Sequence, residues 1–177
     1  LKAKGIEIDT GKRISEIVRE ILPVGLYSVL SGPSFAEEVA RGLPTAVTVA
    51  SRNEGSALFW QSLLNTPRLR IYTSHDVAGT ETGGAVKNIM AIASGLASSL
   101  GLGDNARAAL VSRGLAEIMR FGEALGAHPL TLAGLAGMGD LVLTCYSAQS
   151  RNFRLGMALG RGLSLEEARQ EIGQVAE

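Results

Sequence analysis

The stretch Glu81-Thr-Gly-Gly-Ala-Val-Lys-Asn-Ile-Met-Ala-Ile-Ala-Ser-Gly-Leu-Ala-Ser-Ser-Leu100 divides the sequence into two parts with different patterns. Its many glycines and alanines predict a helix that neighbouring segments can approach closely, because small side chains leave the backbone accessible. Strand-like patterns occur only before this helix, and helical patterns follow it. We therefore place a boundary at about residue 78, between an α/β part (residues 1–78) and an all-helical part (residues 79–177).

The first part alternates between segments with helical and with strand-like periodicity. Large aliphatic residues recur at helical spacing over residues 14–22, with Asp9 and Thr10 as candidate caps. This alternation predicts an α/β fold, in which crossover helices connect the strands of a sheet. From apolar periodicity and β-branched residues, we expect helices over 14–22, 34–41 and 57–64, and strands over 26–30, 45–51 and 69–73.

The second part carries helix signals only. Asp104 or Asn105 can cap the helix that follows the glycine- and alanine-rich one. Ser164 and Glu167 form a capping box for the last helix. Helices are expected over 81–100, from 104 to 125, from Pro129, after Asp140, over 153–159 and over 164–172.

Composition limits the classes of function. Among 177 residues, 17 Lys+Arg balance 17 Asp+Glu, and this zero net charge argues against a general nucleic-acid binder. The single cysteine excludes an internal disulfide framework and a cysteine-based zinc site, and it suits a reducing cytoplasm. The longest uncharged stretches, 88–103 and 124–139, are too short to span a bilayer, and no export signal opens the sequence. We expect a cytoplasmic protein without a membrane span, and neither histidine has a metal-ligand partner at suitable spacing.

Two clusters of candidate binding residues lie at expected helix starts. In Gly32-Pro-Ser-Phe-Ala-Glu37, a turn and a capping box of Ser34 and Glu37 follow a strand, so free N–H groups there suit an anion. An ordinary capped helix explains the same residues, and the spacing alone favours it. Ser150-Arg-Asn152 supplies consecutive donors, and arginine matches the geometry of a phosphate. A solvated helix start is the alternative.

Lys87 and Asp140 are candidates for proton chemistry. Lys87 lies in an otherwise small and apolar helix, so it either reaches solvent or faces a pocket, and the sequence favours neither. Desolvation and a second lysine would lower its pKa and suit it to proton transfer. Asp140 and Thr144 are four residues apart, so a helix places both on one face, unless Asp140 only caps that helix. Cys145, among apolar residues, is expected to be a buried thiol.

Short motifs follow one another in a fixed order through nearly the whole sequence. They are Lys4-Gly-Ile-Glu7, Ser31-Gly-Pro-Ser-Phe-Ala36, Gly83-Gly-Ala-Val-Lys-Asn88, Gly103-Asp-Asn-Ala-Arg-Ala108, Ser112-Arg-Gly-Leu-Ala-Glu117, Gly134-Leu-Ala-Gly-Met-Gly-Asp-Leu141, Thr144-Cys145, Ser150-Arg-Asn152 and Ile172-Gly-Gln-Val-Ala-Glu177. In this order they resemble the bacterial-type NAD(P)-dependent glycerol-3-phosphate dehydrogenase family. The resemblance implies the later part of a Rossmann-like nucleotide-binding domain over residues 1–78 and a helical substrate-binding and catalytic domain over residues 79–177.

The resemblance also implies a reaction, the interconversion of dihydroxyacetone phosphate and sn-glycerol 3-phosphate by hydride transfer with NAD or NADP, NADPH being favoured. Lys87 would be the general acid/base, Lys4 would polarise the carbonyl, and Asp140 would complete the catalytic group. The product would supply phospholipid synthesis, no catalytic metal is implied, and a homodimer is kept as a candidate assembly. Substrate contacts carry over to Lys4, Gly32, Ser34, Lys87, Asn88, Asp140, Thr144, Ser150, Arg151 and Asn152, and cofactor contacts to Lys4, Ala36, Arg151, Val175 and Glu177.

Two departures from the family pattern limit these expectations. The glycine-rich dinucleotide loop of the family does not occur in this sequence, and the family continues with further helices beyond residue 177. We therefore expect this span alone to bind NAD(P) poorly and to turn over little or no substrate.

Two alternative functions are kept beside the leading one. A related two-domain dehydrogenase for another hydroxyacid or sugar acid would share this layout, since fold does not fix function. A non-catalytic helical dimerisation module would use the small residues between Gly84 and Gly95 to contact another chain.

Overall fold

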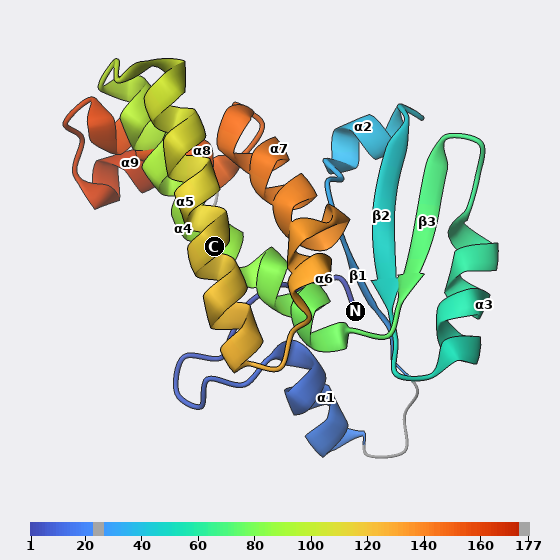
Figure 1. The fold of residues 1–177 in the computed structure, drawn as a ribbon. Helices are drawn as coiled ribbons and strands as arrows, with labels where there is room; N and C mark the ends of the chain where they lie inside the picture. Colours follow the sequence, from blue (N-terminus) through green and yellow to red (C-terminus); the bar gives the residue numbers. More distant parts are fainter. Residues whose placement is uncertain (23–26, 174–177) are drawn as a thin grey trace.

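The computed structural model describes residues 1–22 and 27–173, and it places a small sheet beside a larger cluster of helices (Figure 1). The strands β1 (Val29–Ser31), β2 (Thr45–Ala50) and β3 (Leu69–Ser74) all precede the long helix α4 (Val77–Ser99), so the predicted α/β-then-helical order is confirmed. The other helices are α1 (Ile14–Ile21), α2 (Ala36–Ala40), α3 (Glu54–Leu64), α5 (Gly103–Ala124), α6 (Pro129–Ala133), α7 (Asp140–Tyr146), α8 (Arg151–Gly160) and α9 (Leu165–Ile172), with a π-helical turn η1 (Leu135–Gly139) between α6 and α7.

The sheet has the strand order β1-β2-β3 and mixed direction. β1 runs antiparallel to β2, with Val29 opposite Ala50, whereas β2 and β3 are parallel, with Val47 opposite Ile71. Only α3 is therefore a crossover helix between parallel strands, and the connection through α2 simply reverses the chain. The N–H group of Leu30 donates to the carbonyl of Leu1 at 2.8 Å, so the first residue of the chain lies along the free edge of β1.

Helix α1 lies in the α/β part of the sequence, but its first turn is hydrogen-bonded to a side chain of α4. It begins at Ile14 without the expected cap from Asp9 or Thr10, because Thr10 instead bonds Glu7 within the preceding loop. At its start a local capping box is present, in which Glu16 accepts the N–H of Arg13 at 2.9 Å, and the buried carboxylate of Glu81 receives the N–H of Ser15 at 2.8 Å and its hydroxyl at 2.5 Å. A side chain of α4 thus adds to the local cap and connects the N-terminal segment to the helical cluster.

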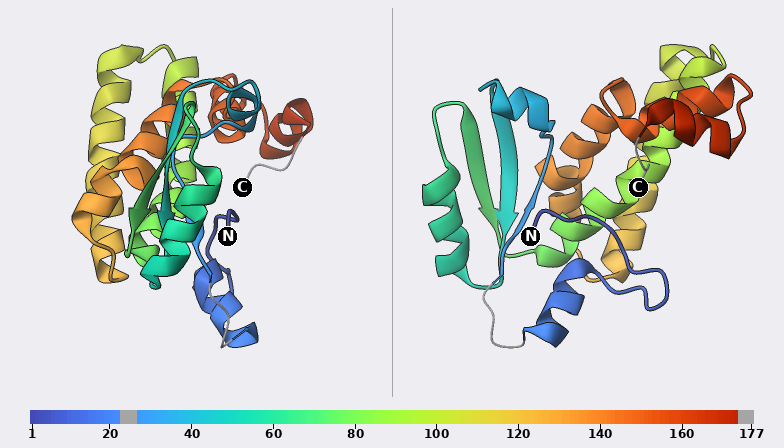
Figure 2. Two further views of the ribbon diagram at one scale, coloured as in Figure 1. Left: turned by 90° about the vertical axis from the view of Figure 1, so that its right-hand side faces the viewer. Right: turned by 180° about the vertical axis from the view of Figure 1, so that it is seen from behind.

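The helical cluster is built around α4. Asp76 caps this helix by accepting the N–H of Gly79 at 2.8 Å, which is why α4 begins earlier than the predicted residue 81. α5 begins at Gly103, so the expected caps Asp104 and Asn105 lie inside its first turn. The capping box predicted at the start of α9 is confirmed, with Ser164 N donating to Glu167 Oε2 at 2.8 Å. Seen from behind, α8 and α9 lie at the end of the cluster away from the sheet (Figure 2).

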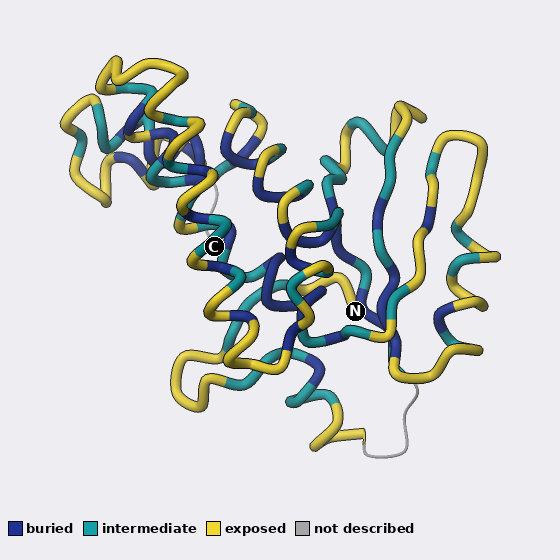
Figure 3. The backbone as a smooth tube through the Cα atoms, viewed as in Figure 1, coloured by how far each residue is buried: buried dark blue, intermediate teal, exposed yellow. Residues whose placement is uncertain are grey.

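The small residues of α4 allow contacts within the chain. A Cβ atom added to Gly95 would lie 2.0 Å from the carbonyl oxygen of Phe153 on α8, and one added to Gly156 of α8 would lie 1.9 Å from that of Ile92 on α4. A Cβ on Gly83 would lie 2.7 Å from the carbonyl of Ala136 in η1. These glycines are therefore used inside the fold, which removes the observation that favoured a dimerisation module. The first turns of α4 are coloured mostly as buried in Figure 3.

The turn η1 has the wider hydrogen bonding of a π-helix. The N–H of Gly139 donates to the carbonyl of Gly134 at 3.0 Å, across five residues instead of four. Gly137 permits this close turn, since a Cβ there would lie 1.9 Å from the carbonyl oxygen of Leu132. Asp140, the first residue of α7, follows immediately.

The stretch Pro129–Tyr146, which comprises α6, η1 and α7, is long and apolar enough to cross a membrane by length and composition, with a mean hydropathy of 1.2. In the structure it is interrupted by the π turn, and it carries the buried carboxylate of Asp140.

Candidate functional site

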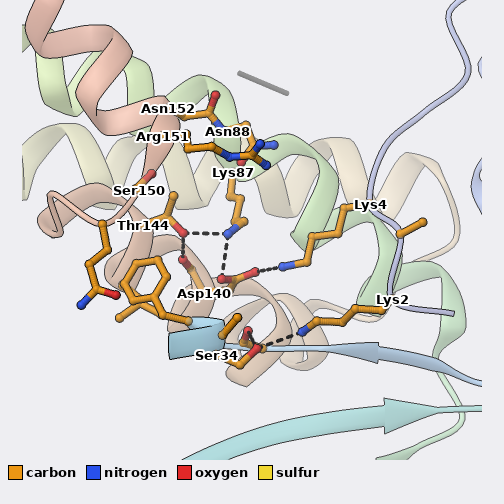
Figure 4. A pocket seen from close by; sticks show the side chains of 16 residues that line it. Lys2, Lys4, Ser34, Lys87, Asn88, Asp140, Thr144, Ser150, Arg151 and Asn152 are labelled. Atoms are coloured by element: carbon orange, nitrogen blue, oxygen red, sulfur yellow. Dashed lines mark hydrogen bonds and ion pairs between the residues drawn. The ribbon is translucent and has the colours of Figure 1, made fainter. Parts of the chain in front are cut away.

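A cavity of about 410 Å³ lies where the N-terminal segment, the loop before α2, α4, α7 and the start of α8 meet (Figure 4). Its volume is within the range of about 300–1,000 Å³ that is typical of small-molecule sites. Segments up to 150 residues apart in the sequence contribute to it, so it exists only in the folded chain. It is lined by Lys2, Ala3, Lys4, Gly32, Ser34, Phe35, Ala36, Lys87, Asn88, Asp140, Leu143, Thr144, Gln149, Ser150, Arg151 and Asn152.

The ammonium group of Lys87 lies at the centre of the cavity wall and does not reach bulk solvent. Its Nζ donates to Asp140 Oδ1 at 2.8 Å and to Thr144 Oγ1 at 2.7 Å, and Lys87 as a whole is only 8% exposed. The hydroxyl of Thr144 donates in turn to the backbone carbonyl of Asp140 at 2.6 Å. Of the two alternatives left open for Lys87, the structure supports a lysine that faces a pocket.

Asp140 does more than begin a helix, because its carboxylate is shared by two lysines. Lys4 donates to the second carboxylate oxygen, Oδ2, while Lys87 occupies the first. The stem of Lys4 lies over Gly84, where an added Cβ would come within 3.2 Å of Lys4 Cδ. One buried carboxylate thus holds the ammonium groups of Lys4 and Lys87 side by side (Figure 4).

The environment lowers the pKa of Lys87. Burial is the largest cause, since it penalises the charged ammonium, and the charge of Lys4 acts in the same direction. Asp140 opposes both effects and raises the pKa. Lys87 is therefore a cation that releases its proton more easily than an exposed lysine, as general acid/base chemistry requires.

The loop after β1 forms a second wall of the cavity. Ser34 does not cap α2, because that helix begins two residues later at Ala36 after Phe35, so the predicted capping box is wrong. The hydroxyl of Ser34 instead donates to the carbonyl of Gly32 at 3.1 Å and accepts from Lys2 Nζ at 2.9 Å. Gly32 has φ 140°, and an added Cβ would lie 3.0 Å from Val47 Cα, so only glycine fits this turn.

Polar side chains at the start of α8 form the opposite wall. Ser150 caps α8 by accepting the N–H of Phe153 at 3.2 Å, and it is buried, so this helix start is not the solvated one of the alternative interpretation. Arg151 and Asn152 lie in the first turn of α8 and reach the cavity beside Asn88 of α4 (Figure 4). Asn152 is 7% exposed, and its Oδ1 has no hydrogen-bond partner among the described residues. A buried acceptor without a partner is suited to a donor on a ligand.

Comparison with known proteins decides the family. Residues 76–177 match the C-terminal part of NAD-dependent glycerol-3-phosphate dehydrogenase, and residues 1–57 match its N-terminal part. The chain belongs to this family. The resemblance inferred from the ordered motifs is thereby confirmed, and so is the fold class, the later part of a Rossmann-like unit followed by helices.

Individual members of the glycerol-3-phosphate dehydrogenase family are closely similar to the chain. The glycerol-3-phosphate dehydrogenase (NAD(P)+) of Alkalilimnicola ehrlichii is 57% identical over 173 residues, which are 97% of this chain and 52% of that protein. The one of Syntrophomonas wolfei is 53% identical over 178 residues, 99% of this chain and 52% of that protein. The chain spans about half the length of the curated relatives it matches.

Solved structures of glycerol-3-phosphate dehydrogenases share the fold. The crystal structure of the Coxiella burnetii protein is 47% identical and superposes with a TM-score of 0.95, covering 99% of this chain and 54% of that one. The yeast protein GPD1 is 31% identical with a TM-score of 0.88, again over 99% of this chain and 54% of that one.

All described residues that the resemblance assigns to substrate or cofactor contacts line this one cavity. Val175 and Glu177, expected to contact the cofactor, lie outside the described residues. Sequence reasoning missed Lys2, whose signal was its position two residues before Lys4, a spacing that places both side chains on one face of an extended segment. The other lining residues that it missed are Ala3, Phe35, Leu143 and Gln149.

Metal chemistry has no support in the described part of the chain. No cluster of three or more His, Cys, Asp or Glu side chains that could hold a metal ion occurs among these residues.

The buried thiol of Cys145 has a pKa raised to about 12, chiefly by burial, so it is not poised as a nucleophile.

Proposed function

We propose that the chain carries the substrate pocket and the proton-donating centre of an NAD(P)-dependent glycerol-3-phosphate dehydrogenase. The observation that carries this proposal is the buried ammonium group of Lys87, which shares the carboxylate of Asp140 with Lys4 inside a cavity that also contains Arg151 and Asn152. Family membership supports the same reaction, the interconversion of dihydroxyacetone phosphate and sn-glycerol 3-phosphate.

The lysines act on the oxygen at C2 of the substrate. NADH or NADPH supplies the hydride when bound. As C2 of dihydroxyacetone phosphate accepts the hydride, the carbonyl π electrons move to the oxygen, and Lys87 gives that oxygen its proton. Lys4 stabilises the growing negative charge, because a fixed cation is most effective where charge develops. In the oxidative direction Lys87, now neutral, takes the proton back.

Asp140 and Thr144 hold this centre in place and do not react with substrate. The carboxylate of Asp140 fixes both ammonium groups and counteracts the loss of positive charge that burial of Lys87 would otherwise cause. Thr144 accepts a hydrogen bond from Lys87 at 2.7 Å and so directs the ammonium group toward the cavity. Such preorganisation avoids a rearrangement of charges during the reaction.

The substrate phosphate is placed at the start of α8. Arg151 offers a planar pair of donors suited to phosphate, and the N-terminal end of a helix favours negative charge. Asn152 and Asn88 lie beside it, and Gly32 and Ser34 face it from the other wall. A phosphate held away from C2 orients the carbonyl toward Lys87 and uses binding energy for positioning.

For the cofactor, the described residues around the Lys4–Asp140–Lys87 centre fit the nicotinamide end. Lys4, Ala36 and Arg151 line the cavity, and the unpartnered Asn152 Oδ1 is an acceptor that a carboxamide N–H can satisfy. The glycine-rich loop that would hold the pyrophosphate does not occur in this sequence. We therefore propose weak NAD(P) binding by these 177 residues alone, to be checked by calorimetric titration with NADPH and NADH; stoichiometric, tight binding would contradict this.

The reaction can be tested in a chimera in which this chain replaces the corresponding segment of the Alkalilimnicola ehrlichii relative. We expect NADPH oxidation that depends on dihydroxyacetone phosphate, and a loss of kcat of about 10²–10⁴-fold in Lys87→Met. The control is Lys12→Met, which removes an exposed lysine paired with Glu20 at 2.7 Å. Circular dichroism establishes that each variant is folded.

Three outcomes would correct the proposal. Turnover of a non-phosphorylated ketoacid, with none of dihydroxyacetone phosphate, would favour the related hydroxyacid dehydrogenase. Full activity in Lys87→Met would remove that residue from proton transfer. A folded chimera that is inactive with both nicotinamide cofactors and every ketone would favour a non-catalytic role.

We further propose a cytoplasmic enzyme without a nucleic-acid partner or membrane span, whose product supplies phospholipid synthesis. The balanced charge of the chain supports the absence of a nucleic-acid partner. The division at about residue 78, one residue into α4, remains our proposal for the domain boundary. A homodimer is kept as a candidate assembly, and light scattering on the chimera would decide it.

A further inference from the structure

Lys2 is a cation of the cavity to which the reaction described above gives no role. Its side chain enters the cavity below Lys4, and its Nζ donates to Ser34 Oγ at 2.9 Å (Figure 4). The hydroxyl of Ser34 is itself oriented, because it donates to the carbonyl of Gly32 at 3.1 Å. The ammonium group of Lys2 therefore has a defined position on the wall opposite the start of α8, although its only described partner is a neutral hydroxyl.

The charges around the cavity leave a positive surplus. Among the described residues, Lys2, Lys4 and Lys87 line the cavity together with one carboxylate, that of Asp140. Both oxygens of that carboxylate are already bonded, one to Lys4 and the other to Lys87. The described hydrogen bond of Lys2 goes to Ser34 and not to this carboxylate, and the excess of lysines over carboxylates favours an anionic ligand.

The pKa of Lys2 agrees with a position inside this field. It is lowered, first by partial burial and then by the charge of Lys4, with a smaller contribution in the same direction from Lys87, while Asp140 raises it. Lys2 is exposed as a residue, and its ammonium group is still close enough to the lysines of the cavity for their charges to act on it. An anion bound beside Lys2 would relieve the repulsion between the lysines.

We propose that Lys2, oriented by Ser34, contacts a phosphate oxygen of a bound ligand. The inference rests on the proposed function, which supplies two sources of this group: the phosphate of the three-carbon substrate and the phosphates of the nicotinamide cofactor. Arg151 and Asn152 lie on the opposite side of the Lys4–Asp140–Lys87 centre (Figure 4). Anionic groups can thus be held on both sides of the reacting carbonyl, with Lys2 setting the position of one of them.

The test compares Lys2→Met, Lys2→Gln and Lys2→Arg in the chimera, with Lys12→Met as the matched control. Calorimetry measures dissociation constants for inorganic phosphate, sn-glycerol 3-phosphate and NADPH, and steady-state kinetics separates KM from kcat. We expect loss of the ammonium group to weaken binding of one phosphate ligand by about 10–100-fold, as for other hydrogen bonds to charged groups, with kcat changed little. Lys2→Arg should retain most of the affinity, because it keeps the charge.

The outcomes identify the source of the phosphate. A higher KM for dihydroxyacetone phosphate with unchanged KM for NADPH assigns Lys2 to the substrate, and the reverse pattern assigns it to the cofactor. If both neutral variants match Lys12→Met for every ligand while their unfolding temperatures are normal, the proposal is overturned. Failure of the proposed function can be distinguished from failure of this inference. If the wild-type chimera is inactive, the dissociation constant for inorganic phosphate, compared with that of Lys2→Met, still shows whether Lys2 binds an anion.

Discussion

Gly156 lies where α8 crosses α4, and replacing it with alanine should separate the two helices. The added Cβ would lie 1.9 Å from the carbonyl oxygen of Ile92, whereas ordinary contact begins at 3.4 Å. The backbones must therefore move apart by about 1.5 Å, because a carbonyl inside a helix cannot swing away. Overpacking of this kind lowers the free energy of unfolding by about 1–3 kcal/mol or more. The higher helix propensity of alanine raises it by about 1 kcal/mol relative to glycine.

The displacement should reach the cavity, since α8 begins with Arg151 and Asn152. We expect Gly156→Ala to lower Tm by about 2–8 °C and to reduce kcat/KM by up to about 10²-fold, mainly through KM for the phosphorylated substrate.

The assays are thermal unfolding and steady-state kinetics of the chimera. The control is Gly55→Ala in α3, where the added Cβ meets only a side-chain oxygen at 3.3 Å. A Gly156→Ala variant with the Tm and KM of this control would refute the reasoning that the helices are in backbone contact.

Other substitutions test separate parts of the structure. Asp140→Asn should lower kcat by about 10²-fold or more and move the alkaline loss of reductase activity to lower pH, because Asp140 raises the pKa of Lys87; an unchanged pH profile would contradict this. Glu81→Gln should destabilise the chain by about 1.5–3 kcal/mol in urea titrations, because the first turn of α1 loses its anionic acceptor. Ser164→Ala should cost about 1 kcal/mol through the cap of α9, without any change in KM. Cys145, with a pKa raised to about 12, should react with iodoacetamide only after unfolding, and rapid labelling of the native chain would count against its burial.

The local signals in the sequence were sufficient for most elements of the fold. Asp140 and Thr144 had the spacing of one helical face, and Pro129 correctly marked the start of α6. Distant partners of the helix ends could not be predicted: beside its local capping box, the first turn of α1 bonds Glu81, 66 residues away from Ser15, and no local pattern reports such a contact. Ser34 does not cap α2, which begins at Ala36. Its hydroxyl instead donates to the carbonyl of Gly32 and accepts a hydrogen bond from Lys2.

In the candidate site, too, contacts between residues far apart in the sequence could not be predicted from local patterns. From the sequence alone, Lys87 was equally compatible with solvent and with a pocket, because the residue that decides between them, Asp140, is 53 positions away. The ordered motifs of the family assign both residues to one site, and in the structure both line one cavity. Lys2 belongs to none of the motifs, and its spacing from Lys4 was a weak signal until the folded chain showed both side chains in one cavity.

The π turn that precedes Asp140 has a consequence for the rotational phase of α7. A turn that closes over five residues in place of four inserts one residue into the helical path, and each residue of an α-helix advances the side-chain direction by about 100°. Deleting one residue from Leu135–Gly139 would let the segment relax to an ordinary α-helix and rotate Asp140 and Thr144 together by about that angle, away from Lys87. The direction of the carboxylate is therefore encoded by the length of a glycine-rich turn, so insertions and deletions there should be far more damaging than substitutions on the exposed side of the same turn.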